Sequence, residues 1–159
     1  MSETESPISL ALYQPDIAQN TGTLMRLSAC LGVPIHVIGP MGFRMDDAAL
    51  KRAGMDYLEL ANLTRHREHA AFEIWRRDTS RRLLLLTTKA DGSYLDFTYQ
   101  PGDVLMVGSE SSGVPEDVHA GADHRIRIPM LANRRSLNVA LAAAMVLGEA
   151  LRQTSGFPT

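Results

Sequence analysis

The hydrophobic positions of this chain fall into short apolar runs that alternate with longer segments of helical spacing. The runs of strand length lie at residues 8–13, 35–38, 57–60, 83–87, 104–107 and 126–128, and the helical patterns lie at 20–31, 46–52, 66–77 and 136–147. Short apolar strands that alternate with helices indicate a mostly parallel sheet with helices on both faces. The pattern therefore predicts an α/β fold.

The first helical pattern separates a leucine stripe from a charged position. Asn20 can cap the helix at its beginning, and Gly32 can end it in a left-handed conformation. Arg26 falls away from the leucine stripe, which is typical of a solvated side chain. Cys30 lies within the apolar pattern, and we expect it to be a small buried side chain that forms no disulfide, because it is the only cysteine.

The segment after the last predicted strand combines a polar loop with an apolar helix. Residues 129–138 form a short basic and polar loop, and we expect Ser136 and Asn138 to lie in the first turn of the helix that follows. Residues 139–147 contain no charged side chain. A helix that is apolar on most of its circumference has to be covered by its own domain or by a second subunit. The segment therefore predicts both a site and a surface for a partner.

Length and charge set limits on the class of protein. The 159 residues predict a single domain, with a core from about residue 8 to residue 153. A formal net charge of −2 argues against a protein that coats nucleic acid by bulk charge, although a local basic face can still bind phosphates. The acidic, polar first residues do not resemble a secretory signal, and the apolar runs are too short to cross a bilayer. We expect a cytoplasmic protein without membrane contact.

Polar loops follow four of the predicted strands, at residues 14–22, 87–93, 108–115 and 129–138. Ligands of open α/β sheets gather at the carboxyl ends of strands. The glycines of loop 108–115 would allow close backbone approach to a ligand, and Glu110 adds a carboxylate. The alternative is an ordinary connection whose serines and glutamate cap the next helix. The chain contains neither a P-loop nor a Gly-x-Gly-x-x-Gly dinucleotide fingerprint.

Other catalytic chemistries find little support. His66 and His69 lie three residues apart, but no second pair or carboxylate cluster completes a metal-ligand spacing, so we expect no metal. Ser136 lacks the Gly-x-Ser-x-Gly setting of a nucleophile. Arginines cluster at several places, including Arg134 and Arg135 beside the polar loop, and these could bind a polyanion if they share a face.

Three segments, in this order along the chain, resemble the motifs of the SPOUT RNA ribose 2'-O-methyltransferases. They are residues 20–22 with Arg26, residues 108–115, and residues 128–130 with 135–138. Each is weak alone, but together they extend the resemblance from about residue 8 to residue 153. Within the superfamily the chain is most similar to the compact TrmL-type enzymes, which act on the wobble nucleotide of tRNA. Ser109, Ser111 and Ser112 depart from that subgroup and look more like the broader TrmH-type group.

The resemblance implies a trefoil knot near the C-terminal end, S-adenosylmethionine as cofactor, tRNA as partner and a homodimer. Gly148 stands where a tyrosine is common, which can alter the packing of such a dimer. The cofactor-binding residues that the resemblance implies are Leu86, Thr87, Gly108, Glu110, Gly113, Ile128, Met130, Ser136 and Leu137. The catalytic residues that it implies are Arg26, Ser136, Asn138, Asn20 and Glu110.

The implied reaction is S-adenosylmethionine-dependent 2'-O-methylation of a ribose in tRNA, at the wobble nucleotide 34. A ribose hydroxyl is a poor nucleophile and needs its proton removed or its alkoxide stabilised. We expect Arg26 beside the attacking oxygen, with Ser136 and Asn138 orienting the ribose. Two alternatives stay open: methylation at another tRNA or ribosomal RNA position, and a catalytically silent RNA-binding dimer.

Overall fold

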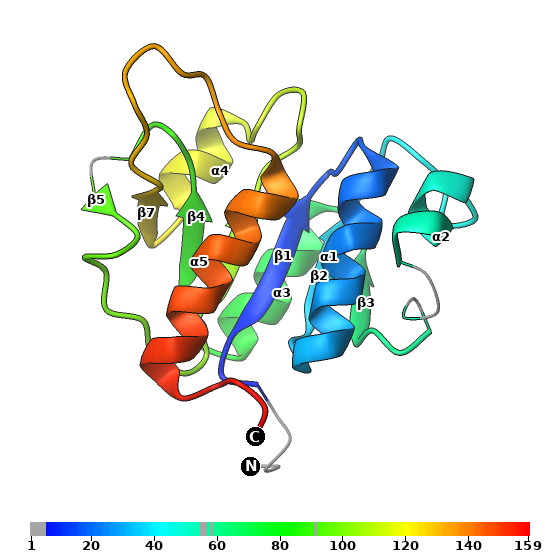
Figure 1. Ribbon diagram of the computed structural model, residues 1–159, viewed down its shortest axis with the longest axis horizontal. Coiled ribbons are helices and arrows are strands. Elements are labelled where there is room, and N and C mark those ends of the chain that lie inside the picture. Colours follow the sequence, from blue (N-terminus) through cyan, green and yellow to red (C-terminus); the bar gives the residue numbers. More distant parts are fainter. Residues whose placement is uncertain (1–5, 55–56, 58, 91) are drawn as a thin grey trace.

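A computed structural model describes residues 6–54, 57, 59–90 and 92–159 of the chain. The described residues form a seven-stranded sheet with helices on both faces (Figure 1). The strands are β1 (Ser9–Tyr13), β2 (Ile35–Ile38), β3 (Leu63–His66), β4 (Leu83–Leu86), β5 (Gly92–Ser93), β6 (Val104–Val107) and β7 (His124–Arg127). The helices are α1 (Ala18–Leu31), α2 (Ala48–Gly54), α3 (His69–Asp78), α4 (Glu116–Gly121) and α5 (Val139–Thr154).

The sheet is parallel throughout its paired strands, in the order β3-β2-β1-β6-β4-β7-β5. The chain first builds outward from β1 to β3 and then crosses to the other side of β1. The two directions meet between β1 and β6, where Leu10 pairs with Leu105. A reversal of this kind opens a crevice at the carboxyl ends of the strands, where ligands of α/β proteins bind. The expected α/β class, with a mostly parallel sheet flanked by helices, is confirmed.

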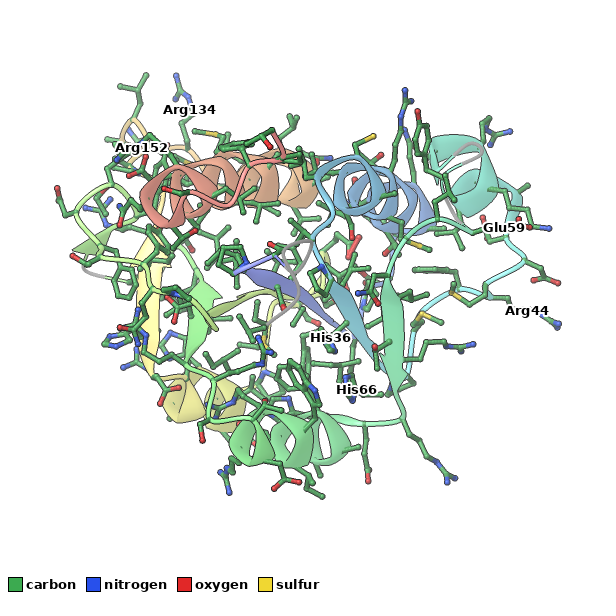
Figure 2. All side chains as sticks on the ribbon, turned by 90° about the horizontal axis from the view of Figure 1, so that it is seen from below. His36, Arg44, Glu59, His66, Arg134 and Arg152 are labelled. Atoms are coloured by element: carbon green, nitrogen blue, oxygen red, sulfur yellow. The ribbon has the colours of Figure 1, made fainter. Side chains whose placement is uncertain are left out.

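The helices form one layer on each face of the sheet (Figure 2). Helices α1, α2 and α5 lie on one face, where aliphatic side chains such as Leu24 and Leu147 pack against the central strands. Helices α3 and α4 lie on the other face, where Phe72 and Val118 cover a second core. Burial on both faces explains why the central strands are continuous apolar runs rather than alternating ones.

The strands at 35–38 and 104–107 lie where the apolar runs predict them. The predicted strand at 57–60 is wrong, because Tyr57 and Leu60 lie in turns, and the Leu60 side chain is 71% exposed. Leu58, within that prediction, lies outside the described residues. The edge strand is β3 instead, whose mixed sequence Leu-Thr-Arg-His gives no apolar run.

Four local predictions about the helices also need correction. Asn20 does not cap α1, because the helix begins at Ala18 and Ile17 is its cap residue. Cys30 is exposed rather than buried, since it lies on the outer side of α1. Ser136 lies in the loop before α5 and not in its first turn, whereas Asn138 caps that helix through its side chain. His66 closes β3, so α3 begins later than expected.

The trefoil knot that the resemblance implies stays a prediction. Within the described part of the chain, no helix is long and apolar enough to cross a membrane.

Candidate functional site

A cavity of about 480 Å³ opens at the carboxyl ends of β4, β6 and β7. It lies beside the crevice between the two halves of the sheet, where the loops after these strands meet the first turns of α1 and α5. Its polar lining includes backbone and side chains of the loops, and its apolar lining includes Val139 and Ala142 of α5. Every residue predicted to hold the cofactor lines it: Leu86, Thr87, Gly108, Glu110, Gly113, Ile128, Met130, Ser136 and Leu137.

The predicted catalytic residues divide into two groups. Asn20, Glu110, Ser136 and Asn138 line the cavity, although they come from positions up to 118 residues apart in the chain. Arg26 does not line it. That side chain is exposed on α1, and its guanidinium lies 5.5 Å from the centre of the Tyr57 ring. The role of Arg26 beside an attacking oxygen therefore stays a prediction.

The Glu110 carboxylate holds the beginning of α1. It accepts hydrogen bonds from the backbone N–H groups of Asp16 (3.2 Å) and Ile17 (3.0 Å), and from Nδ2 of Asn20 (3.2 Å). Carboxylates are favourable at helix N-termini because unpaired N–H groups and the helix dipole both attract them. The expected alternative, in which Glu110 caps the next helix, is wrong: α4 begins at Glu116, its N-cap residue is Pro115, and no side chain caps it.

Asn138 connects the cavity to α5. Its Oδ1 accepts hydrogen bonds from the backbone N–H groups of Ala140 (2.9 Å) and Leu141 (3.2 Å), while its Nδ2 donates to Oδ1 of Asn20 (3.1 Å). Asn20 in turn donates to Glu110. A continuous row of hydrogen bonds therefore joins the start of α5 to the start of α1 along one wall of the cavity.

The loop after β6 is a tight turn closed by two glycines. Ser109 and Gly113 exchange backbone hydrogen bonds of 3.0 and 2.8 Å, and Gly113 has a φ of +65°. A Cβ on Gly108 would lie 2.7 Å from the carbonyl carbon of Gly113, closer than real Cβ contacts come. Only glycine fits at position 108, so the backbone itself forms this part of the cavity wall.

Sequence reasoning missed Asp16, which ties the first loop to the loop after β6. Its Oδ1 accepts a hydrogen bond from the backbone N–H of Glu110 (3.1 Å), and its Oδ2 accepts one from the Ser111 hydroxyl. The hydrogen bond from Ser111 lowers the pKa of the Asp16 carboxyl. The signal was available, because Asp16 follows a strand in the first of the four polar loops. Thr88 and Ser109 also line the cavity and were not singled out.

The described residues contain no group of three or more histidine, cysteine, aspartate or glutamate side chains placed to hold a metal ion. The polar lining of the cavity consists of backbone groups, amides, hydroxyls and the Glu110 carboxylate.

Comparison with known proteins identifies the family of this chain. A model of the SpoU rRNA Methylase family matches residues 7–148. The chain belongs to this family. The matched range contains every residue that lines the cavity. The resemblance to SPOUT ribose methyltransferases is confirmed.

Several proteins that are similar to this chain are named for the methylation of RNA. A relative from Beijerinckia indica subsp. indica, named tRNA (cytidine(34)-2'-O)-methyltransferase, is 60% identical and aligns with 91% of this chain and 90% of its own. A solved structure described as structural insights into the 2-OH methylation of C/U34 on tRNA is 39% identical, with a TM-score of 0.88 over 94% of this chain and 97% of its own. An AdoMet-bound rRNA methyltransferase from Sinorhizobium meliloti is 25% identical, with a TM-score of 0.84 over 91% of this chain and 56% of its own.

Proposed function

We propose that this protein transfers a methyl group from S-adenosylmethionine to the ribose 2'-hydroxyl of nucleotide 34 in tRNA. The observation that carries the proposal is the cavity whose lining contains every residue that the motifs assign to the cofactor. Support for the nucleotide comes from the full-length similarity to relatives named for that position. We further propose a single domain over about residues 8–153 and a cytoplasmic location.

The cavity fits the proposed cofactor. Its volume of about 480 Å³ lies within the range of roughly 300–1,000 Å³ that is typical of small-molecule sites. Leu86, Ile128 and Leu137 offer apolar contacts for a flat ring, and the glycine turn at Gly108 exposes backbone groups beside them. S-adenosylmethionine, when bound, supplies an electrophilic methyl group. The chain supplies the binding surface and the groups that orient the ribose.

The polar wall has a positioning role in this proposal. Glu110 is fully engaged in holding the start of α1, so it keeps Asn20 in place rather than acting as a base. Ser136 lies on the exposed loop at the mouth of the cavity, where its hydroxyl can contact the ribose or its phosphate. Asn138 is anchored on two sides and fixes the inner edge of that mouth.

We also propose that the protein works as a homodimer in which Arg26 reaches the cavity of the second copy. In its own chain Arg26 lies roughly 9 Å along α1 from Asn20, since a helix rises 1.5 Å per residue, and it does not line the cavity. Large apolar side chains are exposed just before and along α5: Leu137 (41%), which lines the cavity, Leu141 (64%) and Met145 (45%). A second copy that covers them would remove this apolar surface from water. Arg26 would then stabilise the developing alkoxide by charge.

The reaction is tested with unmodified tRNA and labelled S-adenosylmethionine, followed by nuclease mapping of the product. Label on the 2'-oxygen of nucleotide 34 supports the proposal, and label at another nucleotide rejects the wobble assignment. Titration calorimetry with S-adenosylmethionine separates the enzyme from a silent RNA-binding dimer, because a silent dimer that has lost the cofactor site gives no binding heat.

The shared site is tested by mixing two inactive variants, Arg26→Ala and Gly108→Val. If Arg26 acts across the interface, each mixed dimer keeps one intact site, so random mixing restores roughly a quarter of the wild-type activity. If Arg26 acts within its own chain, no mixed dimer has an intact site and activity stays absent. Sedimentation of the unmixed variants checks that each still forms dimers.

A further inference from the structure

A second pocket, of about 450 Å³, lies at the opposite end of the sheet from the candidate site. It opens where β4 and β7 begin, whereas the first cavity opens where they end. Four arginines line it, Arg76 and Arg77 in the last turn of α3 and Arg81 and Arg82 just before β4. Asp123 and His124, where β7 begins, complete the lining that matters here.

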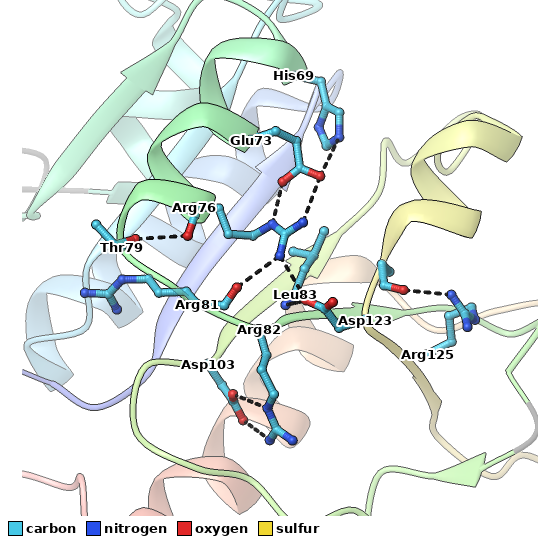
Figure 3. Close-up of polar contacts among 11 residues, drawn as sticks. His69, Glu73, Arg76, Thr79, Arg81, Arg82, Leu83, Asp103, Asp123 and Arg125 are labelled. Atoms are coloured by element: carbon cyan, nitrogen blue, oxygen red, sulfur yellow. Dashed lines mark hydrogen bonds and ion pairs between the residues drawn. The ribbon is translucent and has the colours of Figure 1, made fainter.

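Two of these arginines are neutralised within the chain. Arg76 is 7% exposed and binds the Glu73 carboxylate together with Asp123, at 2.9 Å from the latter. Arg82 binds both carboxylate oxygens of the buried Asp103, at 2.8 and 2.7 Å (Figure 3). Their charges are therefore not available to a ligand.

The other two arginines have no carboxylate partner within the described part of the chain. Arg77 is exposed at the end of α3. The Arg81 guanidinium lies 5.2 Å from the centre of the Trp75 ring, and its buried Nε has no hydrogen-bond partner among the described residues. Since the Arg81 guanidinium binds no carboxylate of the described residues, its outer N–H groups can donate to an external acceptor.

The backbone around Arg81 is fixed by the neutralised pair. Nη1 of Arg76 donates to the carbonyl of Arg81 at 3.0 Å, and the preceding Ser80 takes a left-handed φ of +55°. Figure 3 shows the side chain of Arg81 running away from Arg76 and its carboxylates. Arg77 and Arg81 thus present two cations from a rigid turn.

We propose that this pocket binds a phosphate group of the RNA substrate, which rests on the proposed function. A guanidinium presents donors in a planar fork that matches phosphate oxygens. The protein has a net charge of −2, so electrostatic attraction to a polyanion is strongest at a local basic pocket such as this one. The two ends of β4 lie roughly 10 Å apart at about 3.3 Å per residue, a distance that a folded RNA covers. The RNA would then contact the protein at both ends of the same strand.

Salt-dependent binding of tRNA tests the proposal. Arg77→Gln and Arg81→Gln should each weaken binding by roughly threefold to tenfold at moderate salt and lower the slope of log K against log salt by about 0.7–0.9. Arg152→Gln is the matched control, because that exposed arginine already pairs with Glu149. Unchanged affinity and slope in both pocket variants would overturn the proposal. Arg77 is exposed, so its variant remains informative if Arg81→Gln fails to fold.

Trp75 gives a second readout, because it is the only tryptophan in the sequence and packs against Arg81. Binding of tRNA should change its fluorescence in the wild type, and the change should need more tRNA in Arg77→Gln. A change with inorganic phosphate but none with tRNA would mean a free-anion site and would overturn the RNA proposal. If tRNA is methylated normally while all variants bind it equally, this inference fails and the proposed function stands.

Discussion

Two polar networks lie at opposite ends of the sheet, and one consists of hydrogen bonds to amides and backbone groups whereas the other consists of ion pairs. The loop network, made of Asp16, Asn20, Glu110 and Asn138, joins three loops at the carboxyl end of the sheet through amides and backbone N–H groups. The α3 network, centred on Arg76, joins α3 to the start of β4 and β7 through ion pairs. The first network lies at the candidate site. In the second, the Arg76 and Glu73 side chains are largely buried, whereas Asp123 is 44% exposed beside the second pocket. We infer that the first positions a site and the second stabilises the fold.

Removal of the central arginine is the strongest test of this difference. Arg76→Met leaves Glu73 and Asp123 without their partner at a position that is 7% exposed. Breaking such a pair costs about 3 kcal/mol of unfolding free energy, measured by urea denaturation. Affinity for S-adenosylmethionine in the folded fraction should be unchanged.

The control for Arg76→Met is Arg152→Met. It has the same spacing to its glutamate, Glu149, but its side chain is 69% exposed, so we expect no measurable change in unfolding free energy. Equal losses in the two variants would contradict a special role for the α3 network.

The second largest expected effect is a loss of unfolding free energy at acid pH, caused by His36 on the α3 side of the sheet. Burial, with added repulsion from His66 and Arg81, lowers the pKa of His36 to about 4. An unfolded histidine takes up its proton near pH 6.5, so the unfolded state binds more protons between these values. Stability should therefore fall by about 2–3 kcal/mol as pH drops from 6.5 to 4, with little contribution from this group above pH 7.

Comparison with His36→Phe isolates that effect, because phenylalanine cannot titrate next to Trp75 and His66. Other groups titrate in both proteins, so the quantity to measure is the difference in unfolding free energy at each pH. That difference should change with pH by the amount stated; parallel curves would exclude His36 as the cause.

A change in the loop after β6 should weaken cofactor binding, whereas the changes in the α3 network lower the unfolding free energy. Gly108→Ala forces the chain away from Gly113, where the added Cβ would lie 2.7 Å from a backbone carbon. The displaced wall should weaken S-adenosylmethionine binding by roughly tenfold to a hundredfold, which corresponds to about 1.4–2.8 kcal/mol. Gly92→Ala is the control, because an added Cβ there meets no atom within 4 Å. Tight cofactor binding by Gly108→Ala would show that this turn is not part of the binding wall.

The smallest expected effect on stability is at Asn138, which both caps α5 and lines the cavity. Asn138→Ala removes the cap of α5 and should cost about 1 kcal/mol of unfolding free energy. Asn138→Asp keeps the cap, since an aspartate oxygen accepts from Ala140 and Leu141, but it cannot donate to Asn20. Stability should be kept in the second variant and turnover lowered in both. Full turnover in Asn138→Asp would separate the loop network from the reaction.

The sequence predicts the buried, regular parts of the molecule best. The run Ile35–Ile38 is a strand because it is buried on both faces, and no competing feature shifts its ends. The strand predicted at 57–60 was wrong because the sequence does not distinguish an apolar side chain at the surface, such as Leu60, from one in the core. The prediction that Cys30 is buried was also wrong. The expected helix began at Asn20 and the observed helix begins two residues earlier, at Ala18, so the face on which Cys30 lies was assigned incorrectly.

The motifs predicted the residues of the site, but the hydrogen bonds that connect them could be found only from the folded structure. The turn at Gly108 could be expected from its glycines, but the partners of Glu110 lie 90 or more positions away in the chain. Arg76 looked like one more cation in a basic helix, and only the fold brings Asp123 within 2.9 Å of it. Pairings over such distances leave no periodic signal in one sequence.

The row of amides beside the cavity has a direction. Asn138 must turn its oxygen toward α5, which leaves only its N–H₂ for Asn20, and Asn20 must then turn its own N–H₂ toward Glu110. Every donor along the row thus points the same way and ends on one carboxylate, which also receives the N–H groups before α1. The N–H groups before α1 bind the Glu110 carboxylate directly, and those of α5 are linked to it through Asn138 and Asn20. Loss of this carboxylate would leave the N–H groups of Asp16 and Ile17 and the Asn20 amide without their acceptor, so both helices share one electrostatic anchor beside the cavity.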